Sequence, residues 1–184
     1  ALGIRPHVDR ANPILALIGS PTELTKLQSD RLESQSGVDL ITVDDPASDV
    51  SQLLSRLRAS AEVGKTVIGI RTTSRDGSAP DPLHASQMLT LIIDLAVECA
   101  DSMQLDGIYA SGGDVAFAVL DALGARGYEV ENEVVPLAVS GKLVGGPHDG
   151  LGFATKGGLV GDADAAVECI NQLRSRIRQS EPRI

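Results

Sequence analysis

Aromatic residues are scarce in this chain: they make up 2% of its 184 residues, and tryptophan does not occur. Hydrophobic residues still reach 42%, which is enough for a full core and argues against intrinsic disorder. The core must therefore be built from Val, Ile, Leu and Ala, whose side chains pack closely between helices and strands. A chain of this length is expected to form one domain.

Basic residues are also few relative to acidic ones, and the formal net charge is −9. Such a surface repels phosphate backbones, so we expect no nucleic-acid partner. A small phosphate ligand is still compatible, because local backbone amides and a metal ion outweigh the global field. No apolar stretch approaches the ~20 residues of a membrane span, so no membrane partner is expected either.

Cysteine is limited to Cys99 and Cys169, both within segments of helical pattern. Neither has a second ligand at the spacing of a metal site. We expect two buried, reduced thiols, and with them a cytoplasmic location.

The order of hydrophobic patterns predicts an α/β fold. Residues 1–12 have no clear period and are interpreted as a linker or tail, followed by a single domain over 13–184. Short apolar runs at 13–20, 38–43, 65–72 and 105–111 alternate with helical patterns at 21–37, 45–64 and 83–100, and a further helix follows residue 111. This alternation indicates a parallel sheet with helices on both faces.

The pattern changes after Gly127, where runs at 128–139, 141–146 and 150–158 are typical of strands joined by turns. A final helix is expected over 162–179, with Asp162 or Asp164 near its cap. We therefore predict a three-layer αβα architecture, with a mostly parallel sheet and antiparallel strands added near the C-terminus. Leucines are expected to turn two helices inward: Leu24, Leu27 and Leu32 in one, and Leu53, Leu54 and Leu57 in the other.

Ligands of open α/β sheets bind outside the carboxyl ends of the parallel strands. Three unusual loops are predicted there: Gly19–Ser20, residues 71–82, and the segment Ser111–Gly112–Gly113–Asp114. Two glycines at a helix start let the backbone approach an anion, and Ser20 and Ser111 each add a hydroxyl. Asp114 has two interpretations: a helix N-cap, or a functional group that holds magnesium or takes a proton from an attacking hydroxyl.

A second glycine cluster spans residues 141–161, with eight glycines in 21 residues. Hairpin turns need several of them, but the number favours close backbone approach to a ligand. Lys156 either offers its ammonium to a phosphate or is a solvated residue at a strand end. His148, Arg71 and Arg75 are interpreted as surface residues.

These clusters, in this order, resemble motifs of the four-carbon acid sugar kinase family (DUF1537), in its C-terminal nucleotide-binding domain. The matching segments are LIGSPT at 17–22, SGGDVAFAVLDALG at 111–124, EVVPLAVSGKLVGGP at 133–147 and GLGFATKGG at 150–158. Ser111 and Val115 stand where the family usually has threonine, and TKGGLVG stands where TKSGGFG is usual.

The resemblance implies ATP-dependent phosphorylation of a four-carbon sugar acid of the 3-oxo-tetronate or erythronate type, with ATP and Mg²⁺. It implies ATP contacts at Ser20, Ser111, Gly112, Gly113, Asp114, Gly145, Gly146 and Lys156, and a catalytic role for Asp114. It also implies a homodimer, and a sugar-acid substrate held by an N-terminal half that this chain does not contain. The chain alone is then expected to bind nucleotide weakly and to turn over nothing.

Two other functions stay open from the residues alone. The same strand ends would suit a non-catalytic domain that senses an anionic or phosphorylated metabolite. An interaction domain without a ligand would use the glycines only for turns.

Overall fold

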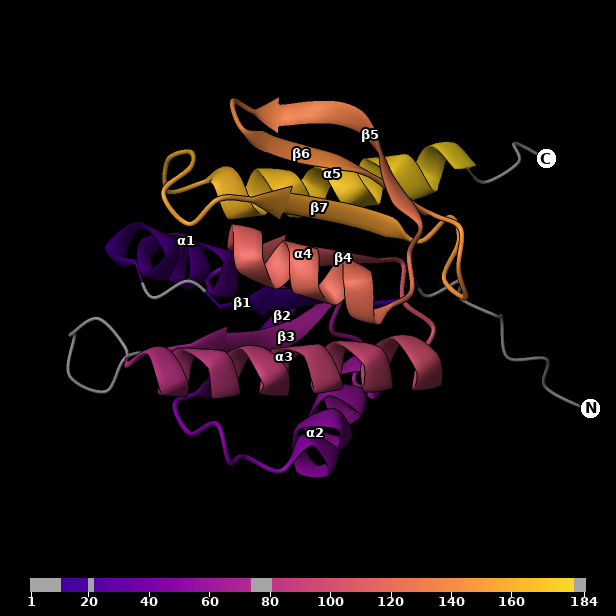
Figure 1. The fold of residues 1–184 in the computed structure, drawn as a ribbon. Helices are drawn as coiled ribbons and strands as arrows, with labels where there is room; N and C mark the ends of the chain where they lie inside the picture. Colours follow the sequence, from indigo (N-terminus) through magenta and orange to yellow (C-terminus); the bar gives the residue numbers. More distant parts are fainter. Residues whose placement is uncertain (1–10, 20–21, 74–80, 181–184) are drawn as a thin grey trace, which may run out of the picture.

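Buried aliphatic strands form the centre of the fold, which the computed structural model describes for residues 11–19, 22–73 and 81–180. Along the chain the elements are β1 (Ile14–Ile18), α1 (Glu23–Glu33), β2 (Val38–Val43), α2 (Val50–Glu62), β3 (Val67–Thr72), α3 (Pro82–Ser102), β4 (Gly107–Ser111), α4 (Gly113–Ala122), β5 (Gly127–Val135), β6 (Ala138–Val144), β7 (Gly152–Lys156) and α5 (Ala165–Ser180). Figure 1 shows helices on both sides of the strands.

The seven strands form one sheet in the order β2-β3-β1-β4-β7-β6-β5. Five neighbouring strands run parallel, from β2 to β7, and β6 and β5 are antiparallel to their neighbours. The mixed α/β sheet is confirmed, but the expectation that all three late strands are antiparallel additions was wrong for β7. β7 pairs in parallel with β4. The chain reverses between β6 and β7, so β7 runs in the same direction as the first four strands.

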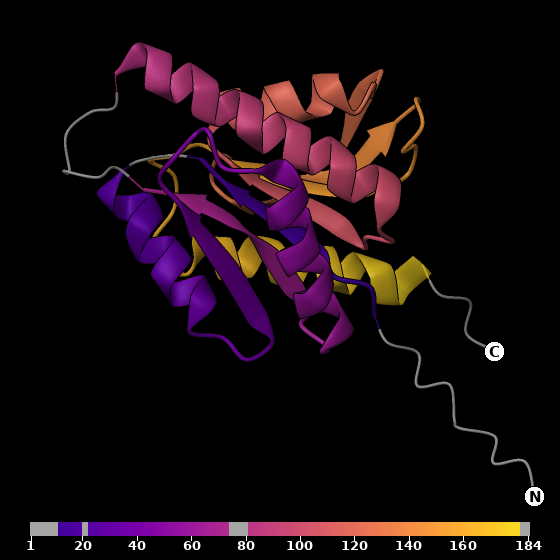
Figure 2. The ribbon, with the colours of Figure 1, turned by 90° about the horizontal axis from the view of Figure 1, so that it is seen from below.

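Two hydrophobic cores give the three layers. One lies between the sheet and α2, α3 and α4, and the other between the sheet and α1 and α5. The two views show these groups of helices on opposite faces (Figures 1 and 2). Cys99 is buried in the first core and Cys169 in the second, both as free thiols, as expected.

The predicted strand over 128–139 is in fact two strands. β5 ends at Val135, and a turn at Pro136 and Leu137 leads into β6. Proline has no N–H to donate to a strand partner, and Leu137 has a φ of 67°, so the chain reverses here.

The predicted inward-facing leucines are correct for α2 but not for all of α1. In α2, Leu53, Leu54 and Leu57 are buried, as expected. In α1 the expectation was wrong for Leu27, which is 53% exposed. The buried side chains of α1 are Thr25, Gln28, Ser29 and Leu32, because this face meets backbone carbonyls as well as the sheet.

Helix α3 is longer and more apolar than the sequence interpretation allowed. By length and composition alone it could cross a membrane, since an 18-residue window has a mean hydropathy of 1.3. Six of its residues are buried in the core: Met88, Leu91, Ile92, Leu95, Ala96 and Cys99. The buried face of α3 is therefore a packing surface for the sheet.

Candidate functional site

Three segments that are distant in sequence meet where β1, β4 and β7 end. The register pairs Ile18 with Ser111 and Ser111 with Lys156, so these strands end side by side. The N–H of Gly19 donates to Ser111 O at 3.3 Å, and the N–H of Gly112 donates to Lys156 O at 3.0 Å. These bonds place the start of α4 beside the residues that follow β7, at the edge where α/β sheets bind ligands.

The start of α4 offers unpaired backbone donors. Its N-cap is Gly112, which has a φ of 113° and carries no side chain that could cap the helix. The first intrahelical bond runs from Ala116 N–H to Gly112 O at 2.9 Å. The amides of Gly113, Asp114 and Val115 therefore have no acceptor among the described residues, and the helix dipole favours an anion in front of them.

Gly113 and Asp114 both face solvent at this position. A Cβ built on Gly113 would meet no atom of the described residues within 4 Å, apart from its own helix backbone and chain neighbours, so this position is uncrowded. The Asp114 carboxylate is exposed and makes no hydrogen bond or ion pair with any described residue. Since Gly112 is the N-cap, the interpretation of Asp114 as the capping residue was wrong, and its carboxylate is free for a ligand.

Ser111 and Lys156 contribute backbone, and their side chains point into the protein. They are 1% and 2% exposed. The Lys156 Nζ donates to Gly157 O at 3.0 Å, and burial lowers the pKa of this ammonium. The Ser111 Oγ is buried without a partner among the described residues. Neither a solvated Lys156 nor a surface phosphate contact through its ammonium agrees with this placement.

The predicted ligands Gly145 and Gly146 lie away from this edge. They follow β6 and pack at the far end of α4, where a Cβ on Gly146 would lie 2.2 Å from Gly124 O. Gly145 donates its N–H to the Asp149 carboxylate at 2.6 Å. The ten residues of α4, about 15 Å of helix, separate them from Gly113. Their positive φ angles of 70° and 81° explain the glycines as turn residues.

Gly157 and Gly158 lie at the strand ends where Gly145 and Gly146 were expected. They begin a turn directly after β7, closed by Val160 N–H donating to Gly157 O at 3.2 Å. The signal was present in the sequence, in the TKGG motif at the end of a predicted strand. Close backbone approach was expected over this whole glycine cluster, but Gly145, Gly146 and Lys156 were named as its ligands.

Val115, which stands where the family usually has threonine, is a core residue. This side chain is 5% exposed, and a Cβ on Gly19 would lie 2.6 Å from its Cγ2. A hydroxyl at this position would face Gly19 and Ile92. Val115 therefore packs α4 against the end of β1.

Other side chains singled out from the sequence have structural partners or lie outside the described residues. Arg71 pairs with Asp30 and Glu33 of α1, and His148 lies 3.1 Å from the Asp101 carboxylate. Ser20 and Arg75 lie outside the described residues, and their roles stay predictions.

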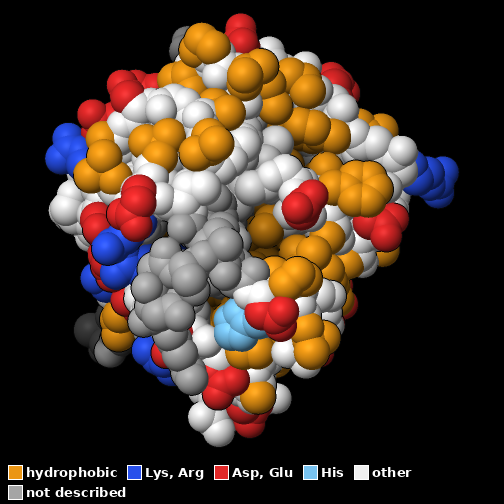
Figure 3. Space-filling view, turned by 60° about the vertical axis from the view of Figure 1, so that its left-hand side comes forward, with side chains coloured by type: hydrophobic (Ala, Val, Ile, Leu, Met, Phe, Trp, Pro, Cys, Tyr) orange, Lys and Arg blue, Asp and Glu red, His pale blue; other side chains and the backbone are white. Residues whose placement is uncertain are grey.

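The surface at this end of the molecule has few cationic side chains in view. In Figure 3, orange hydrophobic side chains cover much of the upper and right-hand surface, and blue side chains lie toward the edges. Among the described residues in this view, an anion would therefore meet few lysine or arginine side chains.

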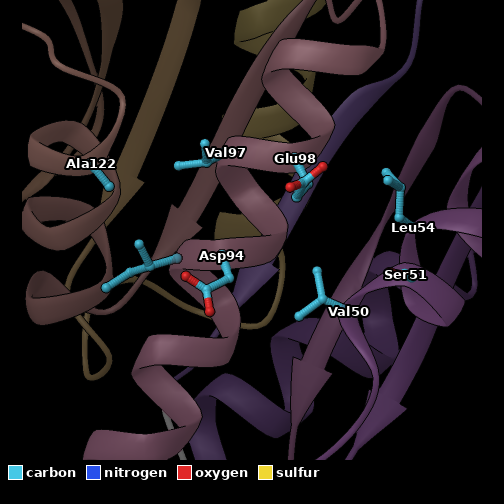
Figure 4. A pocket seen from close by; sticks show the side chains of 8 residues that line it. Val50, Ser51, Leu54, Asp94, Val97, Glu98 and Ala122 are labelled. Carbon is cyan, nitrogen blue, oxygen red and sulfur yellow. The ribbon is translucent and has the colours of Figure 1, made fainter.

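A separate hollow of about 520 Å³ lies between α2, α3 and α4 (Figure 4). Its ionisable lining groups are the carboxylates of Asp94 and Glu98, and the other lining residues are Val50, Ser51, Leu54, Ile93, Val97 and Ala122. Two carboxylates repel phosphate. This hollow is therefore unsuited to an anionic ligand, in contrast to the strand ends.

Comparison with known proteins identifies the family of this chain. A family model described as "Nucleotide-binding C-terminal domain" matches residues 15–166. The chain belongs to this family, the C-terminal nucleotide-binding domains of four-carbon acid sugar kinases. The nucleotide-binding domain is 35% identical to a D-erythronate kinase of Heliobacterium modesticaldum, over 94% of this chain and 44% of that protein. It is 27% identical to a D-threonate kinase of Salmonella typhimurium, over 81% of this chain and 40% of that protein.

A solved structure shares the fold of this nucleotide-binding domain. It is a DUF1537 protein of Bordetella bronchiseptica with bound citrate, described as a domain-swapped dimer, with a TM-score of 0.75 and 26% identity. The match covers 89% of this chain and 41% of that chain. The nucleotide-binding domain therefore spans less than half the length of the relatives it matches.

Proposed function

We propose that this domain binds ATP at the ends of β1, β4 and β7, and that it serves a kinase that phosphorylates a four-carbon sugar acid. The observation that carries the proposal is the uncapped start of α4, where the amides after Gly112 have no acceptor among the described residues and Gly113 is uncrowded. Relatives named as erythronate and threonate kinases support the reaction class.

Backbone amides would make most of the contacts to the phosphates at this site. Amides of Gly113, Asp114 and Val115 would donate to phosphate oxygens, and the glycine turn at 157–158 would lie beside them. ATP supplies the transferable phosphoryl group. Phosphoryl transfer needs mainly positioning and neutralisation of charge, which preorganised amides provide without reorganising during the reaction.

Asp114 is the residue that would hold Mg²⁺. The described residues contain no group of three or more metal-ligating side chains. Magnesium bound with a nucleotide commonly uses one or two carboxylates, substrate phosphates and water. A single exposed carboxylate in the first turn of α4 fits that donor set. The same carboxylate would also lie close enough to the phosphates to accept a proton from an attacking hydroxyl.

The remaining parts of the activity would lie outside this domain. The sugar acid would be held by a second domain, so we expect the chain alone to bind nucleotide without turnover. The domain-swapped dimer of the Bordetella bronchiseptica neighbour supports a homodimer. A cytoplasmic location, and the absence of nucleic-acid and membrane partners, stay predictions.

A sensor of anionic metabolites is the second candidate. Backbone amides at a helix start accept many anions, and the Bordetella bronchiseptica neighbour holds citrate. A sensor should bind its metabolite more tightly than ATP, whereas a kinase domain should prefer ATP and ADP.

Calorimetric titration with ATP and ADP, each with and without magnesium, tests the proposal. Gly113→Leu should weaken binding at least about tenfold, because a large side chain would be added beside the amides proposed to hold phosphate. The fold should persist, since Gly113 has no close neighbour around its Cβ and no positive φ. Ala122→Leu, at the other exposed end of α4, is the matched control and should bind as the parent does.

Absence of binding up to millimolar nucleotide would contradict the proposal for this chain. Tighter binding of citrate or another carboxylate than of ADP would favour the sensor function.

A further inference from the structure

Helix α1 buries a polar face where an amphipathic helix would normally bury leucines. Thr25, Gln28 and Ser29 are 2%, 1% and 3% exposed, whereas Leu27 faces solvent. Burying polar groups is costly unless they find hydrogen-bond partners. The partners of Thr25 and Gln28 are backbone carbonyls of the chain after β7, which leads from the candidate site to α5.

The contacts are short and converge on one stretch of backbone. The Oγ1 atoms of Thr22 and Thr25 each lie 2.9 Å from Gly158 O. The Gln28 Nε2 donates to Val160 O at 3.0 Å and to Asp162 O at 2.6 Å. Side chains on successive turns of α1 thus hold residues 158–162 in one conformation.

These bonds fix the direction of two peptide groups. Gly157 O accepts from Lys156 Nζ and from Val160 N–H, and Gly158 O accepts from α1. In a planar trans peptide the N–H points away from the preceding C=O. The N–H groups of Gly158 and Leu159 therefore point away from these partners, and neither has an acceptor among the described residues. Leu159 is 77% exposed.

We propose that Thr25 and Gln28 are positioning residues that turn the Gly158 and Leu159 amides outward as a second anion-binding arm beside the start of α4. The bond from Gly112 N–H to Lys156 O joins the two arms at their base. The inference rests on the proposed nucleotide site, and it gives the polar face of α1 a function. Phosphate oxygens would then be held from β4–α4 and from the turn after β7 together.

The chain offers a matched control on the same face. Ser29 is equally buried, but its hydroxyl donates to Lys26 O of its own helix at 2.8 Å. Ser29→Ala therefore removes a buried hydroxyl of α1 without touching residues 157–162. Thr25→Ser keeps the donor to Gly158 O, whereas Thr25→Val removes it at nearly the same volume. Gln28→Met removes both donors of Gln28 and keeps the length of the side chain.

The experiment is titration of the full chain and these variants with ADP, followed by calorimetry and by the amide signals of Gly158 and Leu159 in ¹H–¹⁵N spectra. In the parent chain both amides should shift on adding ADP. Thr25→Val and Gln28→Met should each weaken ADP binding about tenfold and reduce the two shifts. Thr25→Ser and Ser29→Ala should bind as the parent does, with both shifts retained.

Several results would overturn the proposal. Parent-like ADP affinity and parent-like shifts in Thr25→Val and Gln28→Met would exclude a positioning role, even if Gly113→Leu abolished binding. An equal loss of affinity in Ser29→Ala would assign the effect to general packing of α1. If Thr25→Val fails to fold, Gln28→Met decides alone. If the parent chain binds no ADP, the nucleotide proposal itself fails, and this inference fails with it.

Discussion

Asp114 shows how little side-chain chemistry the candidate site contains. Asp114→Asn should leave stability nearly unchanged, with a loss of at most about 1 kcal/mol from the helix dipole, since the carboxylate has no partner among the described residues. In the parent, Mg²⁺ should increase the affinity for ADP. In Asp114→Asn this increase should be smaller by a factor of at least about ten, because one carboxylate ligand is lost. Calorimetry with and without Mg²⁺ measures this difference.

Asp121→Asn is the control for that substitution. Asp121 lies on the same helix, is exposed, and has no side-chain partner among the described residues. An equal loss of the magnesium effect in both variants would show that net charge, and not coordination, is responsible.

Gly146 is a residue for which the structure shows a turn-forming role. Gly146→Ala should lower the free energy of unfolding by about 2–4 kcal/mol, since φ is +81° and the new Cβ would lie 2.2 Å from Gly124 O. Urea unfolding measures the loss. The folded fraction should bind ADP with parent affinity, and a selective loss of affinity without loss of stability would restore Gly146 to the site.

At the scale of elements, α2 depends on its first turn. The Asp49 carboxylate accepts from Ser51 N–H at 2.8 Å and from Gln52 N–H at 3.4 Å. Asp49→Ala should therefore cost about 1 kcal/mol in the free energy of unfolding, whereas Asp49→Asn should keep most of the cap. Chemical unfolding of both variants tests this, and equal stability of the alanine and asparagine forms would contradict it.

Element prediction succeeded where one physical rule decided the outcome. The leucines of α2 were placed correctly because an amphipathic helix on a sheet buries its apolar stripe. The leucines of α1 were misplaced because Thr25 and Gln28 find carbonyl partners from residues more than 130 positions away. Local periodicity contains no information about such partners.

For the whole molecule, the two buried thiols predict a loss of stability in alkaline solution. Burial raises the pKa of Cys99 and of Cys169 from 9.0 to about 12. The stabilisation is complete below pH 9.0, where both states keep their protons, and is lost as pH rises toward 12, because only the unfolded thiols ionise. Each thiol should reduce the free energy of unfolding by about 1.4 kcal/mol per pH unit in this window.

Urea unfolding at pH 8 and pH 10.5, under reducing conditions, measures this effect. Cys99→Ala and Cys169→Ala should each show a shallower pH dependence than the parent. An unchanged slope in both variants would assign the alkaline loss to other groups, such as the buried Tyr109, whose pKa burial also raises.

The sequence by itself determined the layered α/β architecture, the buried thiols and the glycine-marked start of α4, because these depend on hydrophobic period and on backbone freedom within a few residues. Only the tertiary structure decided which glycine cluster reaches the strand ends. Gly145–Gly146 and Gly157–Gly158 have similar local sequence character, but β6 and β7 run in opposite directions. The first pair therefore lies at one end of the sheet and the second at the other, beside α4.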